Sequence, residues 1–577
     1  MRTRLILAAL FRVALLTFVD GTLSIRQETT CTDNFPDLLD ADLETVTAGL
    51  GSGLFNSVDL VRAYTARIQE VNEDLHVINE LNPDALAIAA ERDAQRANGT
   101  SLGPLHGIPI LLKDNIATDD QMNNTAGSYV LLGTKVPRDS TVAAKLRAAG
   151  AILLGKANLS QWMQFRSVNT TSGWSAYGGQ VKGGYVEDQE PNGSSSGSAV
   201  AASLGLAFAA IGTETLGSIV FPAAVNNVVG IKPTVGLTSR HLVIPNSKRQ
   251  DTVGPIARTV KDAALILQTI AGVDERDNYT SVIPENGTIP DYIAACREDA
   301  LEGVRIGIPY NIVEGYSQFL EPSLLAAFDD AIQQISAAGA IIVEANFTED
   351  AFETFQSDQN NSLVLTADFT SGIEKYLSQL TDNPLQLKNL SDIRDHTQSH
   401  PSEAYPTRNT LIWDLALSSS NLTSTSPSIY QAYQSALPLA SLILHSALDD
   451  NNASALLLPT IISAAIPAVI GSPIITVPMG AYDNTTKVVM NEWGDLVRTA
   501  PNVPFGVAFL GRKWSEKELV GFAYAFEQRT GWRGRVKPKV VPAVGLGDVV
   551  GDDGGKGRNE CRPGGGDMLG ESVNGTG

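Results

Sequence analysis

The chain has 577 residues, 43% of them hydrophobic, enough for one very large domain or two to three ordinary ones. Its 63 acidic and 42 basic side chains give a formal net charge of −21. This charge repels nucleic acids and anionic membrane surfaces, so neither is expected as a partner.

The N-terminus predicts export. Two arginines, an apolar stretch of about 15 residues and small polar residues follow one another in residues 1–24, as in a secretory signal peptide. Arg12 interrupts the apolar run, which leaves an amphipathic helix as the alternative. The stretch is too short for a stable membrane span. Fourteen N-x-[ST] sequons, against roughly five expected by chance, also favour a secreted glycoprotein, although those at Asn158 and Asn192 lie in tightly packed motifs and are expected to be accidental.

The remaining elements follow an α/β pattern. Residues 140–158 predict a helix closed by Gly150 and then a strand, and residues 323–345 repeat this unit around Gly339. Short apolar runs bounded by Gly or Pro predict further buried strands at 107–112, 304–310, 473–479 and 504–511.

Three segments predict how the second half of the chain is organised. Residues 345–440 are rich in Asn, Ser, Thr and Asp and indicate a surface insertion. The sequence "SEKE" predicts a capping box, formed by Ser515 and Glu518, that begins the last helix. The Gly-rich segment 540–577 predicts a disordered tail. No linker-like segment divides residues 36–535, so these residues are expected to form a single domain.

The cysteines and histidines do not indicate a disulfide scaffold or a metal site. Cys31, Cys296 and Cys561 are too few for a disulfide scaffold, although one bridge between Cys31 and Cys296 is conceivable. His396 and His400 share a helical face, a spacing that is usually ordinary surface rather than a metal site. No metal or organic cofactor is therefore expected.

The serine-rich stretch 191–224 raises the question of a nucleophile. Its "GSSSG" matches the G-x-S-x-G nucleophile elbow, which would make the protein an α/β-hydrolase-type esterase using Ser195. The preceding segment is charged and turn-forming, however, and not a strand. No histidine stands out as a base, so a buried lysine is the alternative proton acceptor. Lys113 ends an apolar run, and burial would lower its pKa toward neutrality; a salt bridge or a solvent-exposed amine is equally compatible with its position.

Together these motifs resemble the amidase signature family of serine hydrolases. The resemblance covers residues 36–535 and rests on motifs that occur in the family's order: "GIPILLKDNI" at 107–116, "GSSSGSAVA" at 193–201, "GTETLGSI" at 212–219, "GIKPTVGL" at 230–237, "DTVGPIARTVKDAA" at 251–264 and "PIITVPMG" at 473–480. It implies a single large α/β domain, a mixed β-sheet covered by helices.

The resemblance also implies a Ser–cis-Ser–Lys triad. Lys113 matches the family's lysine, Ser194 the serine after a cis peptide bond, and Ser218 the nucleophile. Ser195 and its neighbours are then supporting residues. Backbone N–H groups are implied as an oxyanion hole at Thr215, Leu216, Gly217 and Ser218.

The motifs depart from the usual pattern at Glu214, Leu216 and Val220, and Leu216 would narrow the site or line it with apolar surface. The segments 172–199 and 213–224 are similar to the peptide amidase branch. The expected activity is hydrolysis of a small-molecule or peptide amide. The alternatives are a non-catalytic binding protein on the same fold and an amidotransferase subunit, with which the acidic charge and the predicted export conflict. The sequence leaves the oligomeric state open.

Overall fold

The structure is a computed structural model that describes residues 35–357, 360–418 and 422–550. The predicted signal peptide, Cys31, Cys561 and residues 551–577 lie outside these ranges. The described residues belong to one compact unit. Among the described residues, no helix is long and apolar enough to cross a membrane.

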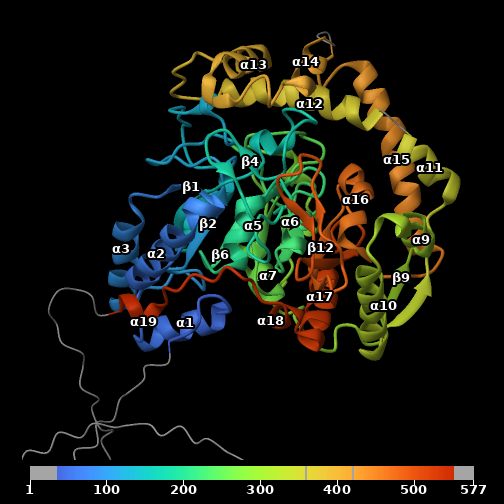
Figure 1. The fold of residues 1–577 in the computed structure, drawn as a ribbon, viewed down its shortest axis with the longest axis horizontal. Helices are drawn as coiled ribbons and strands as arrows, with labels where there is room; N and C mark the ends of the chain where they lie inside the picture. Colours follow the sequence, from blue (N-terminus) through green and yellow to red (C-terminus); the bar gives the residue numbers. More distant parts are fainter. Residues whose placement is uncertain (1–34, 358–359, 419–421, 551–577) are drawn as a thin grey trace, which may run out of the picture. The chain divides into compact units, whose positions relative to one another are not determined.

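A large mixed sheet forms the centre of this unit (Figure 1). In the described residues it has eleven strands, in the spatial order β1 (Ile78–Leu81), β3 (Ile152–Ala157), β2 (Pro109–Lys113), β6 (Ala209–Glu214), β8 (Thr252–Ala257), β7 (Val229–Lys232), β12 (Ile474–Ala481), β15 (Pro504–Leu510), β11 (Ala455–Pro459), β9 (Arg305–Ile308) and β10 (Ile341–Glu344). Strand β2 runs parallel to both β3 and β6, whereas β6 and β8 are antiparallel. The central strands β2, β6 and β8 are buried at every position and mostly apolar, as expected for a sheet covered on both faces.

Helices surround the sheet. Those of the body are α1 (Leu43–Ser52), α2 (Ser57–Leu75), α3 (Ala85–Ala97), α4 (Thr141–Ala148), α5 (Ser196–Ser203), α6 (Val220–Val225), α7 (Val260–Ile270), α8 (Pro284–Gly287), α9 (Tyr310–Tyr316), α10 (Pro322–Ala337), α16 (Ala465–Ile470), α17 (Glu516–Thr530), α18 (Trp532–Arg535) and α19 (Leu546–Val549). Both predicted helix–strand units are present, as α4 with β3 and as α10 with β10. The four other predicted strands correspond to β2, β9, β12 and β15.

The predicted insertion is mainly helical. It contains α11 (Glu349–Ser357), α12 (Asn360–Leu377), α13 (Leu390–Ser399), α14 (Leu411–Ser418) and the first part of α15 (Pro427–Asp449). Helices α12, α13 and α14 group together at the top of the view in Figure 1. Trp413 and Phe369 pack in one hydrophobic cluster with Trp162, which belongs to the body. The insertion is therefore attached to the body by an apolar core of its own.

Two predictions about the C-terminal region are wrong. Helix α17 begins where expected, but the Ser515 side chain does not cap it, because its hydroxyl donates to the Arg512 carbonyl 2.7 Å away and closes the preceding turn. Residues 540–550 are ordered: Leu546 is buried in α19, and the Arg67 guanidinium donates to the Val544 carbonyl at 2.7 Å. Buried arginine donors thus hold a segment whose composition suggests disorder.

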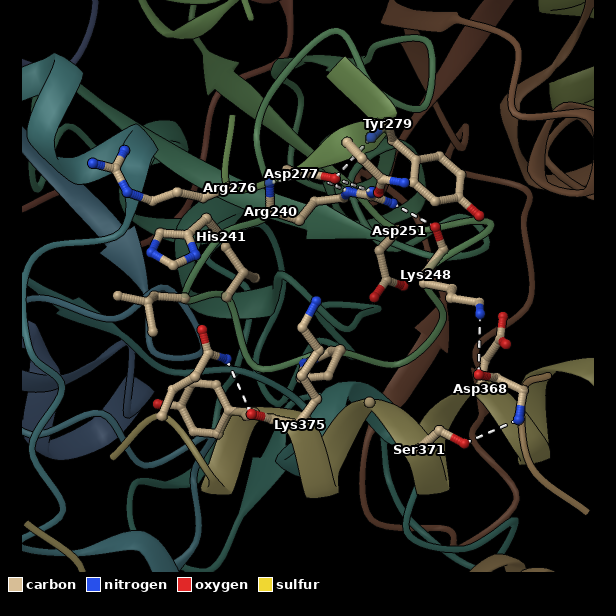
Figure 2. A pocket seen from close by; sticks show the side chains of 18 residues that line it. Arg240, His241, Lys248, Asp251, Arg276, Asp277, Tyr279, Asp368, Ser371 and Lys375 are labelled. Atoms are coloured by element: carbon tan, nitrogen blue, oxygen red, sulfur yellow. Dashed lines mark hydrogen bonds and ion pairs between the residues drawn. The ribbon is translucent and has the colours of Figure 1, made fainter. Parts of the chain in front are cut away.

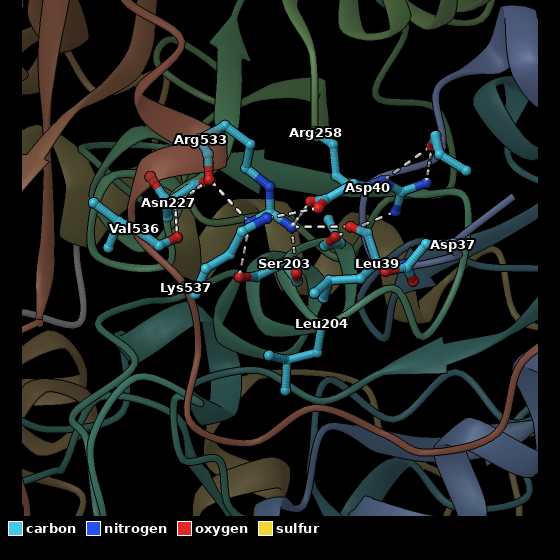
Figure 3. Close-up of polar contacts among 12 residues, drawn as sticks. Asp37, Leu39, Asp40, Ser203, Leu204, Asn227, Arg258, Arg533, Val536 and Lys537 are labelled. Carbon is cyan, nitrogen blue, oxygen red and sulfur yellow. Dashed lines mark hydrogen bonds and ion pairs between the residues drawn. The ribbon is translucent and has the colours of Figure 1, made fainter. Parts of the chain in front are cut away.

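A second arginine fixes the end of α5, the helix that begins within the serine-rich motif. The Arg533 guanidinium donates to the Ser203 carbonyl at 2.6 Å, to the Leu39 carbonyl at 3.1 Å and to the Asn227 carbonyl at 3.2 Å (Figure 3). Three distant segments of the chain therefore meet at the C-terminus of α5.

A buried carboxyl makes stability depend on pH. Glu527 of α17 accepts the Val260 N–H at the start of α7 at 2.8 Å, and burial raises the pKa of Glu527 to about 8 from its ordinary 4.5. Burial likewise raises the pKa of Asp262 to about 6. Because the unfolded chain loses these protons more readily, the free energy of unfolding falls as the pH rises from about 4.5 to 8.

Glu527→Gln should flatten this dependence. The amide oxygen can still accept the Val260 N–H, and each pKa unit is worth about 1.4 kcal/mol, so the variant should gain a few kcal/mol relative to wild type between pH 5 and pH 8. Thermal unfolding at both pH values measures this gain. Glu518→Gln, which alters an exposed residue of the same helix, serves as the control. Equal pH slopes in Glu527→Gln and wild type would contradict the prediction.

Candidate active site

Lys113 is the last residue of β2, the strand that lies between its parallel neighbours β3 and β6. The Lys113 side chain is completely buried. Its Nζ lies 2.8 Å from Ser194 Oγ, 2.9 Å from Ser195 Oγ and 3.0 Å from the Thr213 carbonyl oxygen. None of these partners is a carboxylate. The structure therefore brings Lys113 and Ser194 together, and the salt-bridge and solvent-exposed interpretations of Lys113 do not apply.

The pKa of Lys113 is shifted in the direction that a base requires. Burial holds the pKa of Lys113 well below its ordinary value of 10.5, and the charges of Glu214 and Asp251 oppose this shift only in part. A neutral amine is therefore accessible at a pH where an exposed lysine is charged.

Ser194 is fully buried, and the peptide bond between Gly193 and Ser194 is cis, as the resemblance implies. The Ser194 carbonyl accepts the Ser160 N–H at 3.1 Å. A Cβ atom at position 193 would come within 2.3 Å of Ser160 Oγ, so only glycine fits there. The backbone around Ser194 is thus packed closely against the loop that follows β3.

Ser195 is also buried, and its hydroxyl is engaged on several sides. Besides its contact with Lys113, Ser195 Oγ donates to the Thr213 carbonyl at 3.1 Å and accepts the Thr213 N–H at 3.3 Å. No strand leads directly into residues 193–197, which the structure describes completely. This is not the arrangement of a nucleophile elbow, whose serine stands exposed after a strand.

Ser218 lies in the turn between β6 and α6 and is half-buried. Its carbonyl accepts the Ser195 N–H at 3.1 Å, which ties this turn to the Ser194 segment. The Ser218 hydroxyl makes no hydrogen bond with any described residue. The structure therefore places the three predicted residues in three segments that contact one another, with the Lys113–Ser194 hydrogen bond formed.

The carboxylate of Glu214 organises this turn. It accepts the N–H groups of Gly217 at 2.8 Å, Ile219 at 2.7 Å and Val220 at 3.1 Å. Burial raises the pKa of Glu214, whereas Lys232 and these donors lower it. Gly217 has a φ of +74°, and a Cβ there would meet Phe221 at 2.2 Å, so the turn requires glycine.

One of the four predicted oxyanion donors is already occupied. Because the Gly217 N–H points to Glu214, it is not directed toward a substrate oxygen in this structure. The N–H groups of Leu216 and Ser218 have no acceptor among the described residues, and the Thr215 hydroxyl donates to Asp251 Oδ1 at 2.6 Å.

Asp251 is a second carboxylate that supports the turn. Its Oδ2 accepts the N–H groups of Asn246 at 2.8 Å and Ser247 at 2.9 Å, and burial raises the pKa of Asp251 to about 6. Thr215 is thus connected through Asp251 to the loop before β8.

A cavity of about 430 Å³ is lined in part by Leu216, a residue that is 42% exposed. Its wall mixes apolar side chains, such as Ile312 and Phe347, with polar ones, such as Asn361 and Ser463, and no charged side chain lines it among the described residues. Leu216, which departs from the family's pattern, therefore contributes apolar surface to a cavity beside the turn between β6 and α6.

A fully buried ion pair attaches the insertion to the loop that contacts Ser194. Arg166 Nη1 lies 2.9 Å from Glu403 Oε2, and both side chains are inaccessible to solvent. Gln161 Nε2 donates to the same carboxylate at 2.6 Å, and Ser128 Oγ donates to its other oxygen at 2.6 Å. Ser160, whose N–H donates to the Ser194 carbonyl, directly precedes Gln161. These two neighbouring residues couple the insertion to the site.

These supporting carboxylates were not predicted from the sequence. Glu214 and Asp251 each stand in a Gly-rich or apolar motif, where an acidic residue indicates a buried carboxylate with backbone donors. Glu403 has no such signal, because it lies in a polar segment and its partners are over 200 residues away.

Comparisons with known proteins show which family the chain belongs to. The family model described as Amidase matches residues 59–520. A putative amidase of Arthroderma benhamiae is 47% identical over 533 residues, 88% of this chain and 88% of that protein. The native peptide amidase of Stenotrophomonas maltophilia has a TM-score of 0.76 and 36% identity over 88% of this chain and 99% of its own. The peptide amidase PAM in complex with the competitive inhibitor chymostatin has a TM-score of 0.77 and 36% identity, covering 87% of this chain and 99% of that one.

The family model covers most of the chain, and the 47% identical relative and the solved structures agree with it. The chain belongs to the amidase family.

Proposed function

We propose that this protein hydrolyses the carbon–nitrogen bond of a linear amide through an acyl-enzyme, with Ser218 as nucleophile, Ser194 as proton relay and Lys113 as base. The observation that carries the proposal is the 2.8 Å contact between the buried Lys113 amine and Ser194 Oγ. A neutral amine has two hydrogens and one lone pair. The two hydrogens can go to Thr213 O and Ser195 Oγ, which leaves the lone pair to accept the Ser194 proton.

The relay then proceeds in two steps. Lys113 takes the Ser194 proton while Ser194 takes the Ser218 proton, and Ser218 Oγ forms a bond to the amide carbonyl carbon. Backbone N–H groups of Leu216 and Ser218, with that of Thr215, would stabilise the oxyanion. Collapse breaks the carbon–nitrogen bond, and the proton returns through the relay to the departing amine. Water then hydrolyses the acyl-enzyme by the same route.

The substrate class is inferred from the cavity at Leu216. Its wall is uncharged and includes the apolar side chains of Leu216, Ile312 and Phe347, which favours an uncharged group with apolar surface next to the scissile amide. The likeness to peptide amidases supports a C-terminal peptide amide as the substrate. We also infer that the protein is exported, as residues 1–24 and the sequons suggest. Asn98, Asn278 and Asn452 are exposed, whereas Asn158 is buried and donates to the His76 carbonyl at 2.8 Å.

A fluorophosphonate probe tests the proposal. The purified protein should be labelled on one serine, and peptide mass mapping should place the label on Ser218. The same preparation should release ammonia from peptide amides with an apolar C-terminal residue. A label on Ser195 would support the esterase alternative instead. The absence of both labelling and ammonia release would support a non-catalytic binding protein.

A further inference from the structure

A second cavity, of about 490 Å³, lies beside the loop that holds Thr215 (Figure 2). Its wall is formed by residues from 240–251 and 276–279, by Ser424, by the second half of α12 from Asp368 onward, and by Gln379 just after this helix. In Figure 2 the Lys375 side chain extends from α12 toward the middle of this space, and Lys248 approaches from the opposite loop. The cavity has the size of an ordinary small-molecule site.

The charges of the wall do not cancel. Arg240 is paired with Asp277 at 2.7 Å, and Asp368 is paired with Arg249. Asp251 is already satisfied by neutral donors. Lys248 Nζ donates only to Ser424 Oγ, at 3.0 Å, and the Lys375 ammonium contacts no acidic group in the described residues. Two ammonium groups therefore remain without a carboxylate, in a chain whose formal net charge is −21.

Two further groups in the wall have unused hydrogen-bonding capacity. The Tyr376 hydroxyl and His241 Nε2 are buried and have no partner in the described part of the chain. Tyr376 itself is 3% exposed. Both atoms are closed off from solvent, so contact with a ligand falls to the ammonium groups of Lys248 and Lys375, which are exposed.

We propose that this cavity binds a carboxylate-bearing ligand, held by the ammonium groups of Lys248 and Lys375. The site touches the catalytic turn, because Asp251 in its wall accepts the Thr215 hydroxyl three residues before Ser218. Lys248 belongs to the same short loop whose N–H groups hold Asp251. An occupant is thus positioned to influence the nucleophile turn.

The carboxylate of the bound ligand has two conceivable sources with the same chemistry. It is either an acidic group of the amide substrate itself or a separate small carboxylate that acts as an effector. The binding site does not depend on the proposed function, but both kinetic consequences do.

Binding is measured first, by isothermal titration of citrate at constant ionic strength into the full chain carrying Ser218→Ala. Adding Lys248→Ala and Lys375→Ala should weaken citrate binding by about 10-fold or more, since hydrogen bonds to charged groups are lost. Lys388→Ala, an exposed lysine of the insertion outside the cavity, should not change it. Absence of citrate binding, or equal affinity in all variants, overturns the proposal. This readout needs no turnover, so it stands apart from a failure of the proposed function.

Kinetics then separate the sources. If the substrate supplies the carboxylate, the two lysine substitutions should lower the ratio of kcat/KM for an acidic amide to that for its neutral counterpart about 10-fold. If an effector supplies it, citrate should change kcat/KM for the neutral amide in wild type and in Lys388→Ala but not in the lysine double variant. If citrate binds through the lysines but neither effect appears, the link to the catalytic turn is refuted.

Discussion

Ser218→Ala should lower kcat for amide hydrolysis by at least about 10⁴-fold, because no other group can form the acyl-enzyme in its place. The fold should be unaffected, since the Ser218 hydroxyl makes no hydrogen bond with the described residues and the Glu214 carboxylate holds the turn through backbone donors. The measurement is steady-state ammonia release, with circular dichroism as a check on folding. The variant should also lose the fluorophosphonate label.

The matched control is Ser195→Ala, which removes a neighbouring hydroxyl of the same motif. Ser195 Oγ contacts Lys113 and Thr213, so its loss should reduce kcat by roughly 10–100-fold through weaker positioning. The label on Ser218 should persist. If Ser195→Ala instead lost both activity and label while Ser218→Ala retained them, the assignment of the nucleophile would be reversed.

Lys113→Met should produce the second large loss, of roughly 10²–10⁴-fold in kcat/KM, through removal of the base. Methionine nearly fills the same space but cannot accept a proton. In the wild type, kcat/KM should fall as the pH drops through the pKa of Lys113, which burial holds well below 10.5, because protonation removes the lone pair. This inflection should disappear in the variant, whose kcat/KM should instead rise steadily with hydroxide concentration. The deficit should therefore shrink above the pKa of Lys113, where the wild-type value has levelled off. A kcat/KM profile over pH measures both effects.

Lys156→Met controls for the loss of a buried ammonium as such. Lys156 is also fully buried, donates to the Ile116 carbonyl at 2.6 Å and has its pKa lowered to about 8 by burial. Its substitution should lower the thermal unfolding temperature but leave the pH inflection in place. If Lys156→Met removed the same inflection, Lys113 would not be the titrating group.

The sequence predicts the parts of the site that depend on local pattern. The apolar run of β2 places Lys113 in the interior because alternate faces of a central strand are both covered. The family resemblance supplies the cis bond before Ser194, which the residues alone would not indicate. The helix–strand units around Gly150 and Gly339 follow from periodicity and from the two glycines, both of which have positive φ.

The remainder depends on contacts between distant residues. The capping box at Ser515 fails because the Arg512 carbonyl competes for the serine hydroxyl. Residues 540–550 are ordered by the Arg67 side chain, which is about 475 residues away along the chain. The oxyanion prediction includes Gly217 because the motif does not show that Glu214 folds back to take its N–H.

The Arg166–Glu403 pair limits how the insertion of this chain can be exchanged. Removing either partner would leave a charge buried without its counter-charge, which typically costs about 3–5 kcal/mol. An engineered segment around residue 403 that lacks the carboxylate would therefore also require a changed loop at 160–166. In this chain, the two segments have to be redesigned together.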